Sequence, residues 1–241
     1  MKLEEYQLMA DQQRWHWWYS TKRAYLDQVL STLKLPPSAK ILDLGSGVGA
    51  NFPVLRRFGQ VEGVEQSTLG RQLSQKNHPE KVKAGDLNTL TLPKNHYDVI
   101  TILDVLYHQA ITDDTAVLRR ALLGLRKGGY LIITDCAHPW LFGPHDEANM
   151  ARQRYTLKEL QSKVESAGGR VLRSSYLFGF SFPLFIMARV ADRFSGKTSE
   201  DQARPGFLNT VLQSFGQIEA RLLKIINLPA GSSILIVAKK K

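Results

Sequence analysis

Short apolar runs alternate with amphipathic stretches along most of the chain. Seven of these runs have the length and composition of strands: "AKILDLG", "QVEGVE", "EKVKAGD", "YDVITILDV", "YLIITDCA", "RVLRSSYLFG" and "SSILIVAK". The fourth run has too few polar positions for an exposed face, so we expect it to be buried on both sides. Strands that alternate with helices at this spacing predict an α/β fold with a doubly wound parallel sheet.

Capping residues and prolines predict where the helices end. The helical pattern over residues 3–34 stops at Pro36, and a helix from Thr112 to Gly128 has acidic residues in its first turn. A long, mainly helical stretch separates the last two strands. We therefore expect four segments: an N-terminal helical cover (1–35), a core (36–182), a helical lid insertion (183–230) and the closing strand of the core (231–241).

The composition is that of an ordinary globular protein, with 43% hydrophobic and 22% charged residues in 241. A single cysteine, Cys136, suits a reducing compartment, and the first residues lack the apolar region of a secretory signal, so we expect a cytoplasmic protein. The longest apolar stretch, from Tyr176, is interrupted by Gly179 and Pro183 and is too short to span a membrane. It has the composition to touch a membrane surface.

The net charge of +10 is able to attract nucleic acid, anionic lipid or an acidic substrate. No basic stretch with interleaved aromatic residues is present, so we do not expect nucleic acid as a partner. The sequence leaves the oligomeric state open.

A glycine-rich loop follows the first predicted strand. Gly45, Gly47 and Gly49 allow a tight turn and a close approach of a ligand to the backbone. With Ala50 the spacing also satisfies G-x-G-x-x-A, and Glu65 ends the second strand, where a carboxylate accepts hydrogen bonds from ribose hydroxyls. The loop and this acid alone do not distinguish a dinucleotide from a second class of adenosine cofactor.

Further acids at the carboxyl ends of the strands distinguish the two classes. Asp43 precedes the loop by two residues, where it would repel a pyrophosphate but is able to bind an ammonium group or to orient the loop. Asp86 follows the third strand, and Asp104, Tyr107 and His108 follow the fourth. Open α/β sheets bind ligands at this edge.

In this order and spacing the motifs resemble the class I S-adenosylmethionine-dependent methyltransferases. The residues that carry the resemblance are "ILDLGSGVG", Glu65, "AGDLNTLTLPKNHYDVITILDVLYH" and "LRRALLGLRKGGYLIITD". They cover roughly residues 38–138, and "INLPAGSSILIVAKK" is similar to the family's closing strand. The resemblance implies a Rossmann-like sheet of seven strands with the last strand antiparallel.

The resemblance also implies which residues hold the cofactor, S-adenosyl-L-methionine. The loop Gly45, Ser46, Gly47 and Gly49 would hold its methionine end, and Glu65 would bind its ribose. The other implied contacts are Asp86, Leu87 and Gln66 at the adenine, Leu103 and Asp104 at the sulfonium, Trp18 or Tyr19 over the cofactor, and Arg23 near its carboxylate.

Methyl transfer requires that the acceptor be aligned with the activated methyl group, and a hydroxyl acceptor also needs a base. Histidine suits this role near neutral pH. His108 is the first candidate because it follows the fourth strand; His138 follows the fifth, and His16 lies in the cluster "RWHWWYS". We do not expect a catalytic metal, and we expect Cys136 to lie in the core.

The cluster "RWHWWYS" predicts a helix packed over the site. In a helix, Trp15, Trp18 and Tyr19 share one side with Lys22 and Tyr25, whereas Trp17 points nearly opposite to Trp15. No basic amphipathic face accompanies the tryptophans, which disfavours a membrane anchor there.

We therefore predict a methyltransferase that acts on a small-molecule or lipid-like acceptor, with oxygen favoured as the methylated atom. Three other classes remain open: a nucleic-acid methyltransferase, a non-catalytic cofactor-binding protein of the same fold, and a dinucleotide oxidoreductase.

Overall fold

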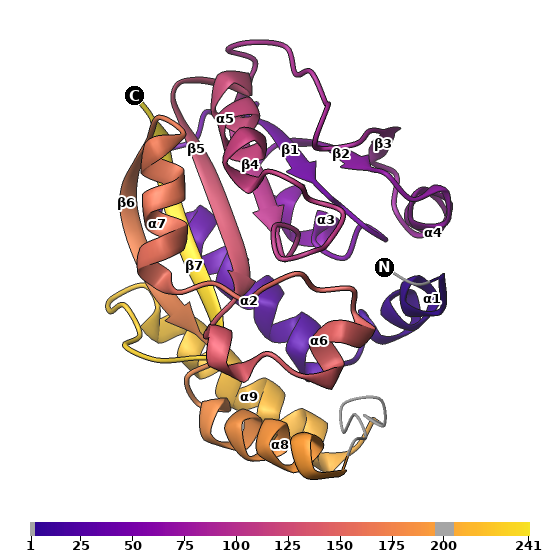
Figure 1. Ribbon diagram of the computed structural model, residues 1–241. Helices are drawn as coiled ribbons and strands as arrows, with labels where there is room; N and C mark the ends of the chain where they lie inside the picture. The colour runs from indigo at the N-terminus through magenta and orange to yellow at the C-terminus, as the bar shows by residue number, and fades with distance from the viewer. Residues whose placement is uncertain (1–2, 196–204) are drawn as a thin grey trace.

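The computed structural model describes residues 3–195 and 205–241 and contains one mixed sheet (Figure 1). Its seven strands have the order β3-β2-β1-β4-β5-β7-β6. Strand β7 pairs antiparallel with both β5 and β6, while the pairs among β1 to β5 are parallel. The prediction of a seven-stranded Rossmann-like sheet with an antiparallel last strand is confirmed. The strand bounds are β1 Lys40–Leu44, β2 Gln60–Glu65, β3 Lys81–Ala84, β4 Tyr97–Leu103, β5 Leu125–Cys136, β6 Gly169–Leu177 and β7 Ser233–Lys240.

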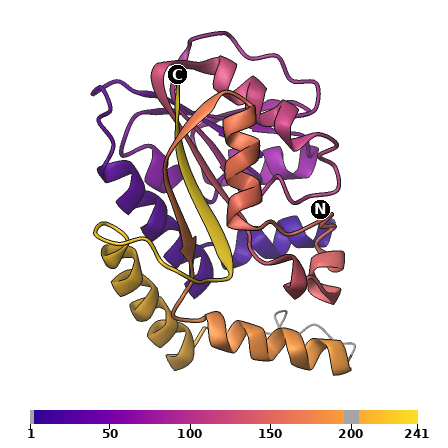
Figure 2. The same cartoon turned by 60° about the vertical axis from the view of Figure 1, so that its left-hand side comes forward.

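Alternate residues of the central strands face two separate apolar layers. Leu42 and Ile100 contribute to the layer under α5 (Asp114–Gly124) and α7 (Leu157–Ser166). Their neighbours along the strands contribute to the opposite layer, under α2 (Trp17–Ser31), α3 (Phe52–Leu55) and α9 (Phe207–Leu222). Figure 2 shows helices on both sides of the sheet. This two-sided burial is why β4 contains so few polar residues.

The N-terminal cover is interrupted, contrary to the single helical pattern expected over residues 3–34. It consists of α1 (Leu3–Gln12) and α2, separated by residues 13–16. His16 starts the second helix, since its backbone is extended and its Nδ1 accepts a hydrogen bond from the N–H of Trp18 at 3.2 Å. The break allows α1 to turn onto the glycine loop, where Tyr6 and Ala10 pack with Val48 and Ala50.

The helix expected from Thr112 to Gly128 is shorter at both ends. Asp113 is its N-cap and accepts a hydrogen bond from the N–H of Ala116 at 2.9 Å, and the helix ends at Gly124. The sequence that follows, starting at Leu125, joins β5 instead. Leu125 is fully buried and pairs with Tyr97 of β4, so sheet pairing overrides the helical pattern there.

The remaining helices lie either beside β2 and β3 or near the carboxyl end of β5. They are α4 (Thr68–Asn77), η1 (Pro139–Leu141), α6 (Pro144–Ala148) and α8 (Phe182–Ser195). Of these, α4 packs against β2 and β3, while α6 and α8 lie near the end of β5 (Figure 1). No helix in the described ranges has both the length and the apolar character needed to cross a bilayer.

Candidate functional site

The glycine loop leaves β1 in a conformation that glycine adopts easily. Gly45, Gly47 and Gly49 have φ values of +74°, +54° and +80°. The N–H groups of Gly45 and Ser46 both donate to the carbonyl of Val64, at 2.8 and 3.0 Å. A Cβ at Gly45 would lie 2.6 Å from the Val105 side chain. The loop is therefore a tight turn held against β2, with no room for side chains on this side.

Glu65 fixes the loop from the end of β2. Its Oε2 accepts a hydrogen bond from the N–H of Gly47 at 2.9 Å, and its Oε1 accepts one from the N–H of Ser67 at 2.7 Å. The Tyr6 hydroxyl of α1 also donates to Oε1, at 3.0 Å. A carboxylate at this strand end is expected to bind a ribose hydroxyl, and in the structure Glu65 accepts the Tyr6 hydroxyl.

Asp43 is a buried carboxylate with one unsatisfied oxygen. Asp43 is 1% exposed, and its Oδ1 accepts a hydrogen bond from the Thr101 hydroxyl at 2.6 Å across the β1–β4 pair. Its Oδ2 is buried and has no hydrogen-bond partner among the described residues. Burial raises the pKa of Asp43 to about 7. A cationic ligand would supply the missing partner.

Two further carboxylates, Asp104 and Asp135, follow β4 and end β5. Asp104 has a φ of +56°, and its Oδ1 accepts a hydrogen bond from the Thr134 hydroxyl at 3.3 Å. Asp135 accepts backbone N–H groups of Cys136 and Tyr107 at 2.8 and 3.2 Å, while burial raises its pKa to about 7. We call Asp43, Asp104 and Asp135 the carboxylate cluster.

Lys22 of α2 reaches into the carboxylate cluster, and the sequence interpretation did not assign it a role. Its ammonium group forms an ion pair with Asp104 and lies 4.3 Å from the centroid of the Trp18 ring. Burial lowers the pKa of Lys22 to about 8, against the attraction of Asp43 and Asp135. In the sequence, the signal that could have pointed to Lys22 was its position within the apolar side of the N-terminal helix. A cavity of about 20 Å³, room for a single water molecule, lies beside it.

The comparisons with known proteins identify the family of this arrangement. Residues 15–174 match the model of a family described as a methyltransferase domain. The chain is 29% identical over 157 residues to "Phosphoethanolamine N-methyltransferase 3" of Arabidopsis thaliana, which is 61% of this chain and 30% of that protein. It is also 29% identical over 133 residues to "Ubiquinone/menaquinone biosynthesis C-methyltransferase UbiE" of Shewanella woodyi, 51% of each chain.

The fold also resembles a Haemonchus contortus phosphoethanolamine N-methyltransferase 2 solved in complex with S-adenosyl-L-methionine. The TM-score is 0.59 at 16% identity, over 90% of this chain and 52% of that one. The chain belongs to the class I S-adenosylmethionine-dependent methyltransferases. It spans about a third to a half of the length of the curated relatives named above. The family match decides against a dinucleotide as the cofactor.

The residues present fit the cofactor of this methyltransferase family. S-adenosylmethionine carries an ammonium and a sulfonium cation, and the structure offers the unsatisfied Oδ2 of Asp43 together with Asp104. Ser46 likewise has a buried hydroxyl without a hydrogen-bond partner among the described residues. A Cβ at Gly47 would meet only the Met9 sulfur of α1, at 3.6 Å. The N-terminal cover, through Met9 of α1, therefore lies over the side of the glycine loop on which Gly47 leaves space.

The other residues implied by the family resemblance differ in burial and in hydrogen bonding. Asp86 accepts hydrogen bonds at Oδ1 from the N–H and the side-chain amide of Asn88, at 2.9 and 2.8 Å. Leu87 is buried in the layer under α5, Leu103 packs against the layer under α2, and Gln66 is exposed. Arg23 is half-buried, and burial lowers its pKa.

The three histidines proposed as bases have different surroundings. The Nδ1 of His108 accepts the N–H of Ala110 at 3.0 Å, and burial lowers its pKa to about 4. His138 has a φ of +64°, stacks between Tyr176 and Phe182, and its Nε2 lies 3.0 Å from the carbonyl of Gly231. The Nδ1 of His16 caps α2, as described above. His16 and His108 thus accept hydrogen bonds from nearby backbone N–H groups and His138 contacts Gly231, whereas Lys22 contacts the carboxylate cluster.

The tryptophans pack onto the segment that joins β6 to α8. Trp17 lies edge-on to Phe178 and Phe180, with centroids 5.9 and 5.8 Å apart. Trp18 stacks on Phe178 at 6.0 Å and lies edge-on to Tyr19. The two neighbouring indoles therefore share one apolar surface, while Trp15 precedes α2, so the helical spacing expected for it does not apply. This surface places Lys22, one turn after Trp18, over the carboxylate cluster.

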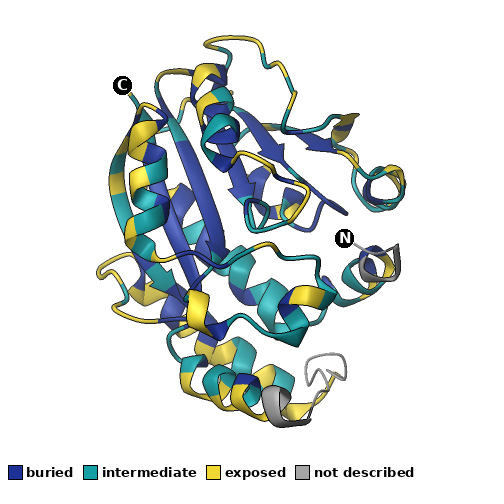
Figure 3. Cartoon of the chain, viewed as in Figure 1, coloured by how far each residue is buried: buried dark blue, intermediate teal, exposed yellow. Residues whose placement is uncertain are grey.

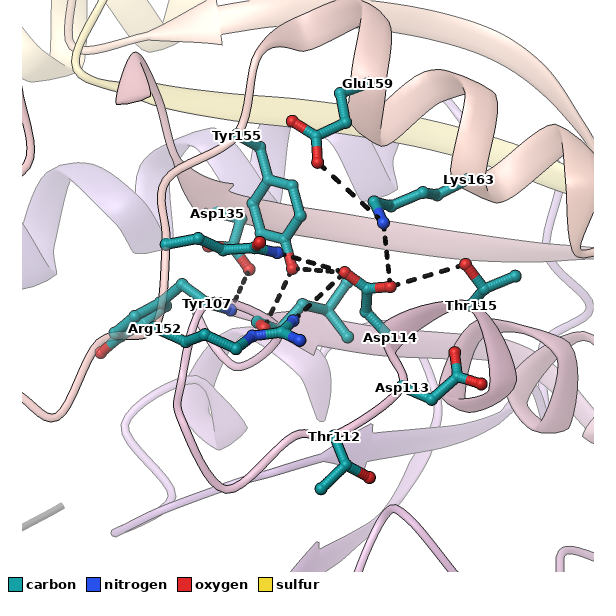
Figure 4. A network of polar contacts seen from close by, with 12 residues as sticks. Tyr107, Thr112, Asp113, Asp114, Thr115, Asp135, Arg152, Tyr155, Glu159 and Lys163 are labelled. Carbon is teal, nitrogen blue, oxygen red and sulfur yellow. Dashed lines mark hydrogen bonds and ion pairs between the residues drawn. The ribbon is translucent and has the colours of Figure 1, made fainter. Parts of the chain in front are cut away.

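A second polar network, centred on Asp114, was not predicted (Figure 4). The Tyr155 hydroxyl lies 2.8 Å from Asp114 Oδ2 and 3.0 Å from the carbonyl of Leu106. Lys163 of α7 donates to Asp114 Oδ1 at 3.2 Å, and Arg152 donates to Oδ2 at 3.3 Å. The network ties α5, α7 and the segment 149–156 together. In sequence, Asp114 looked like an ordinary acid of the first helical turn.

Two remaining expectations concern Cys136 and a metal. Cys136 is the last residue of β5 and is half-buried, whereas a core position was expected, and burial raises the pKa of its thiol to about 12. Across the parts of the chain that the structure describes, no three His, Cys, Asp or Glu side chains are grouped so as to hold a metal ion.

Proposed function

We propose that this chain transfers the methyl group of S-adenosylmethionine to a small-molecule or lipid-like acceptor at the carboxylate cluster. The observation that supports this most is the under-satisfied Asp43 beside the glycine loop, because a buried carboxylate oxygen without a partner favours a cation. S-adenosylmethionine supplies the activated methyl group when it is bound. The residues of this chain bind and orient the cofactor and the acceptor, and they exclude water from the site.

These contacts support a binding role for each group. Glu65 would exchange the Tyr6 hydroxyl for the ribose hydroxyls, and its contact with Gly47 keeps the loop in place. Asp43 and Asp104 would face the cationic end. Since Tyr6 and Lys22 contact these same acids, the cover has to shift on binding. Its aromatic residues would then shield the site from water.

We propose Lys22 as the proton acceptor for a hydroxyl nucleophile. A lysine with a pKa of about 8 is partly neutral near neutral pH and is able to accept a proton, whereas a histidine with a pKa of about 4 is a weak base. Lys22 also lies at the carboxylate cluster, at the ends of β4 and β5. This supports oxygen as the methylated atom. His108, His138 and His16 remain the alternative bases.

A small amine is the second candidate acceptor. The carboxylate cluster that attracts the cofactor also attracts an ammonium group, and the Arabidopsis relative is named for N-methylation of phosphoethanolamine. An amine that reaches the site in its neutral form needs no base. Lys22 is then dispensable for the chemical step.

The experiment is transfer of labelled methyl groups to phosphoethanolamine, to a phenol, to small-molecule extracts and to RNA and DNA, with wild type and Lys22→Arg. For a hydroxyl acceptor we expect Lys22→Arg to slow transfer by about 10²–10⁴-fold, because arginine keeps the charge and cannot accept a proton. The wild-type rate should rise with pH through about 8.

Lys34→Arg, an exposed position after α2, is the matched control and should leave the rate unchanged. An unchanged rate in Lys22→Arg contradicts the role of Lys22 and favours the amine. Labelling of nucleic acid alone, or cofactor binding without any transfer, contradicts the proposed function itself.

A further inference from the structure

The helices α8 and α9 expose large apolar side chains that no described residue covers. Phe207 is 86% exposed, Ile225 82%, Leu208 69% and Met187 68%. Figure 3 shows exposed residues along both helices, which lie at the lower end of the molecule in this view. Monomeric soluble proteins seldom expose apolar residues in such a group unless the surface binds something.

The exposed apolar residues of α9 lie on one side of the helix. At 100° per residue, the spacing from Leu208 through Phe215 and Ile218 to Leu222 keeps them within about 100° of arc. A different side of α9 packs on α2, through Gly216 and other buried residues. Pro183, Leu184, Met187, Val190 and Ala191 form a comparable exposed face on α8. We call these two faces, with Ile225 and Ile226, the α8–α9 apolar surface.

Among the described residues, positive charges lie beside the α9 part of the α8–α9 apolar surface. Arg221 and Lys224 are exposed beside it. Within 181–191 and 205–226 the one acid is Glu219, which is buried and accepts hydrogen bonds from Tyr25 and from the N–H groups of Gly179 and Phe180. An apolar face bordered by the cations Arg221 and Lys224 is complementary to an anionic lipid surface.

The surface is also coupled to the cover of the functional site. The Asn209 side chain of α9 accepts a hydrogen bond from the N–H of Trp17 at 2.8 Å and donates one to the carbonyl of Trp15 at 2.9 Å. Gln213 donates to the Ser20 hydroxyl at 2.8 Å. Figure 1 places α8 and α9 beyond the end of β5 where the carboxylate cluster lies. A partner on this surface would therefore lie on the same side of the molecule as the cover.

We propose that the α8–α9 apolar surface docks on the surface of an anionic lipid bilayer. The apolar side chains enter the boundary between headgroups and acyl chains, and Arg221 and Lys224 contact lipid phosphates. A second copy of the chain is the other occupant that an apolar face could take, and the experiment below distinguishes it from a bilayer.

The test is sedimentation of the protein with phosphatidylcholine vesicles that contain or lack phosphatidylglycerol. We expect binding to the anionic vesicles and at least tenfold weaker partitioning of the triple variant Phe207→Ser, Leu208→Ser, Ile225→Ser. Arg221→Glu with Lys224→Glu should also weaken binding, and salt should reduce it. Leu123→Ser with Leu172→Ser, exposed apolar positions on α5 and β6, and Lys94→Glu with Lys127→Glu are the matched controls and should bind like wild type.

Other outcomes overturn the proposal. It fails if wild type does not bind anionic vesicles, or if the control variants lose as much binding as the triple variant. It also fails if sedimentation in solution shows a dimer that the triple variant dissociates, since a second copy then covers the surface. Circular dichroism of each variant establishes that it is folded before the vesicle assay.

Discussion

The buried carboxylates of this molecule differ in how many hydrogen-bond and ion-pair partners their surroundings supply. Burial alone would raise the pKa of Asp114, but hydrogen bonds from Tyr155 and Lys163 hold it below its ordinary value. Asp146 is paired with the buried guanidinium of Arg154 at 2.8 Å. Asp43, by contrast, has one hydrogen bond and one unsatisfied oxygen, and burial raises its pKa to about 7.

The difference separates acids that hold the fold from an acid that we propose to bind the cofactor. Asp114 and Asp146 fasten α6 and the segment 149–156 to the rest of the molecule. Asp43 stabilises little in the free protein, since desolvation of its charge is not repaid by a full set of partners. A carboxylate of this kind, at the ligand-binding edge of an α/β sheet, indicates a functional site.

The largest expected effect is the loss of a structural acid. Asp146→Ala leaves Arg154 buried without its carboxylate, so we expect the free energy of unfolding to fall by about 3–5 kcal/mol. Urea denaturation followed by circular dichroism measures it. The adjacent Glu147→Ala, at an exposed position, should change stability by less than about 0.5 kcal/mol. Equal effects of the two substitutions would show that the buried pair is not structural.

For Asp43→Asn we expect unchanged stability and a loss of cofactor affinity, in contrast to the loss of stability expected for Asp146→Ala. The amide keeps the size of the side chain and removes a charge that is costly to bury, so the variant should be no less stable than wild type at pH 8. Its affinity for S-adenosylmethionine should fall at least about tenfold, which is about 1.4 kcal/mol. Urea denaturation and calorimetric titration give the two values. A destabilised variant with normal affinity would move Asp43 into the structural group.

A smaller effect is expected from pH. The cation of the ligand favours the ionised form of Asp43, so binding lowers its pKa and releases a proton. Affinity should therefore rise several-fold as the pH increases through about 7, the pKa of the free protein. For folding the sign is reversed. Because the pKa of Asp43 is higher in the folded protein than in the unfolded chain, its contribution to stability is fully present below the unfolded pKa and is lost as the pH rises through about 7. Titration calorimetry at a series of pH values measures the first effect, and Asp43→Asn should weaken it.

The sequence predicted the core of the sheet and the cofactor side of the site more completely than the rest. Short apolar runs with period two, glycine turns and strand-end acids are local signals, and they predicted that Gly45, Glu65 and Asp43 lie at one edge of the sheet; the role of these residues toward the cofactor stays a prediction. The position of Lys22 depends on how α2 packs on the sheet, which no local pattern contains. A lysine inside the apolar side of a helix was the available hint.

Competition between neighbouring patterns explains the misplaced element boundaries. The helical pattern in the sequence continued through Leu125, but this residue pairs with β4 and therefore belongs to the sheet. The network around Asp114 joins segments some fifty positions apart, such as Asp114 and Lys163. Long-range polar pairing of this kind has no periodic signature in the sequence.

The most direct test of the central claim is calorimetric titration of S-adenosylmethionine into wild type, Glu65→Ala and Glu62→Ala. The two acids lie on β2, but Glu65 holds the glycine loop, whereas Glu62 pairs with Lys83 at 2.8 Å on the surface. We predict saturable binding to wild type and Glu62→Ala, and at least about tenfold weaker binding to Glu65→Ala. Equal affinity of all three proteins would contradict the site assigned here.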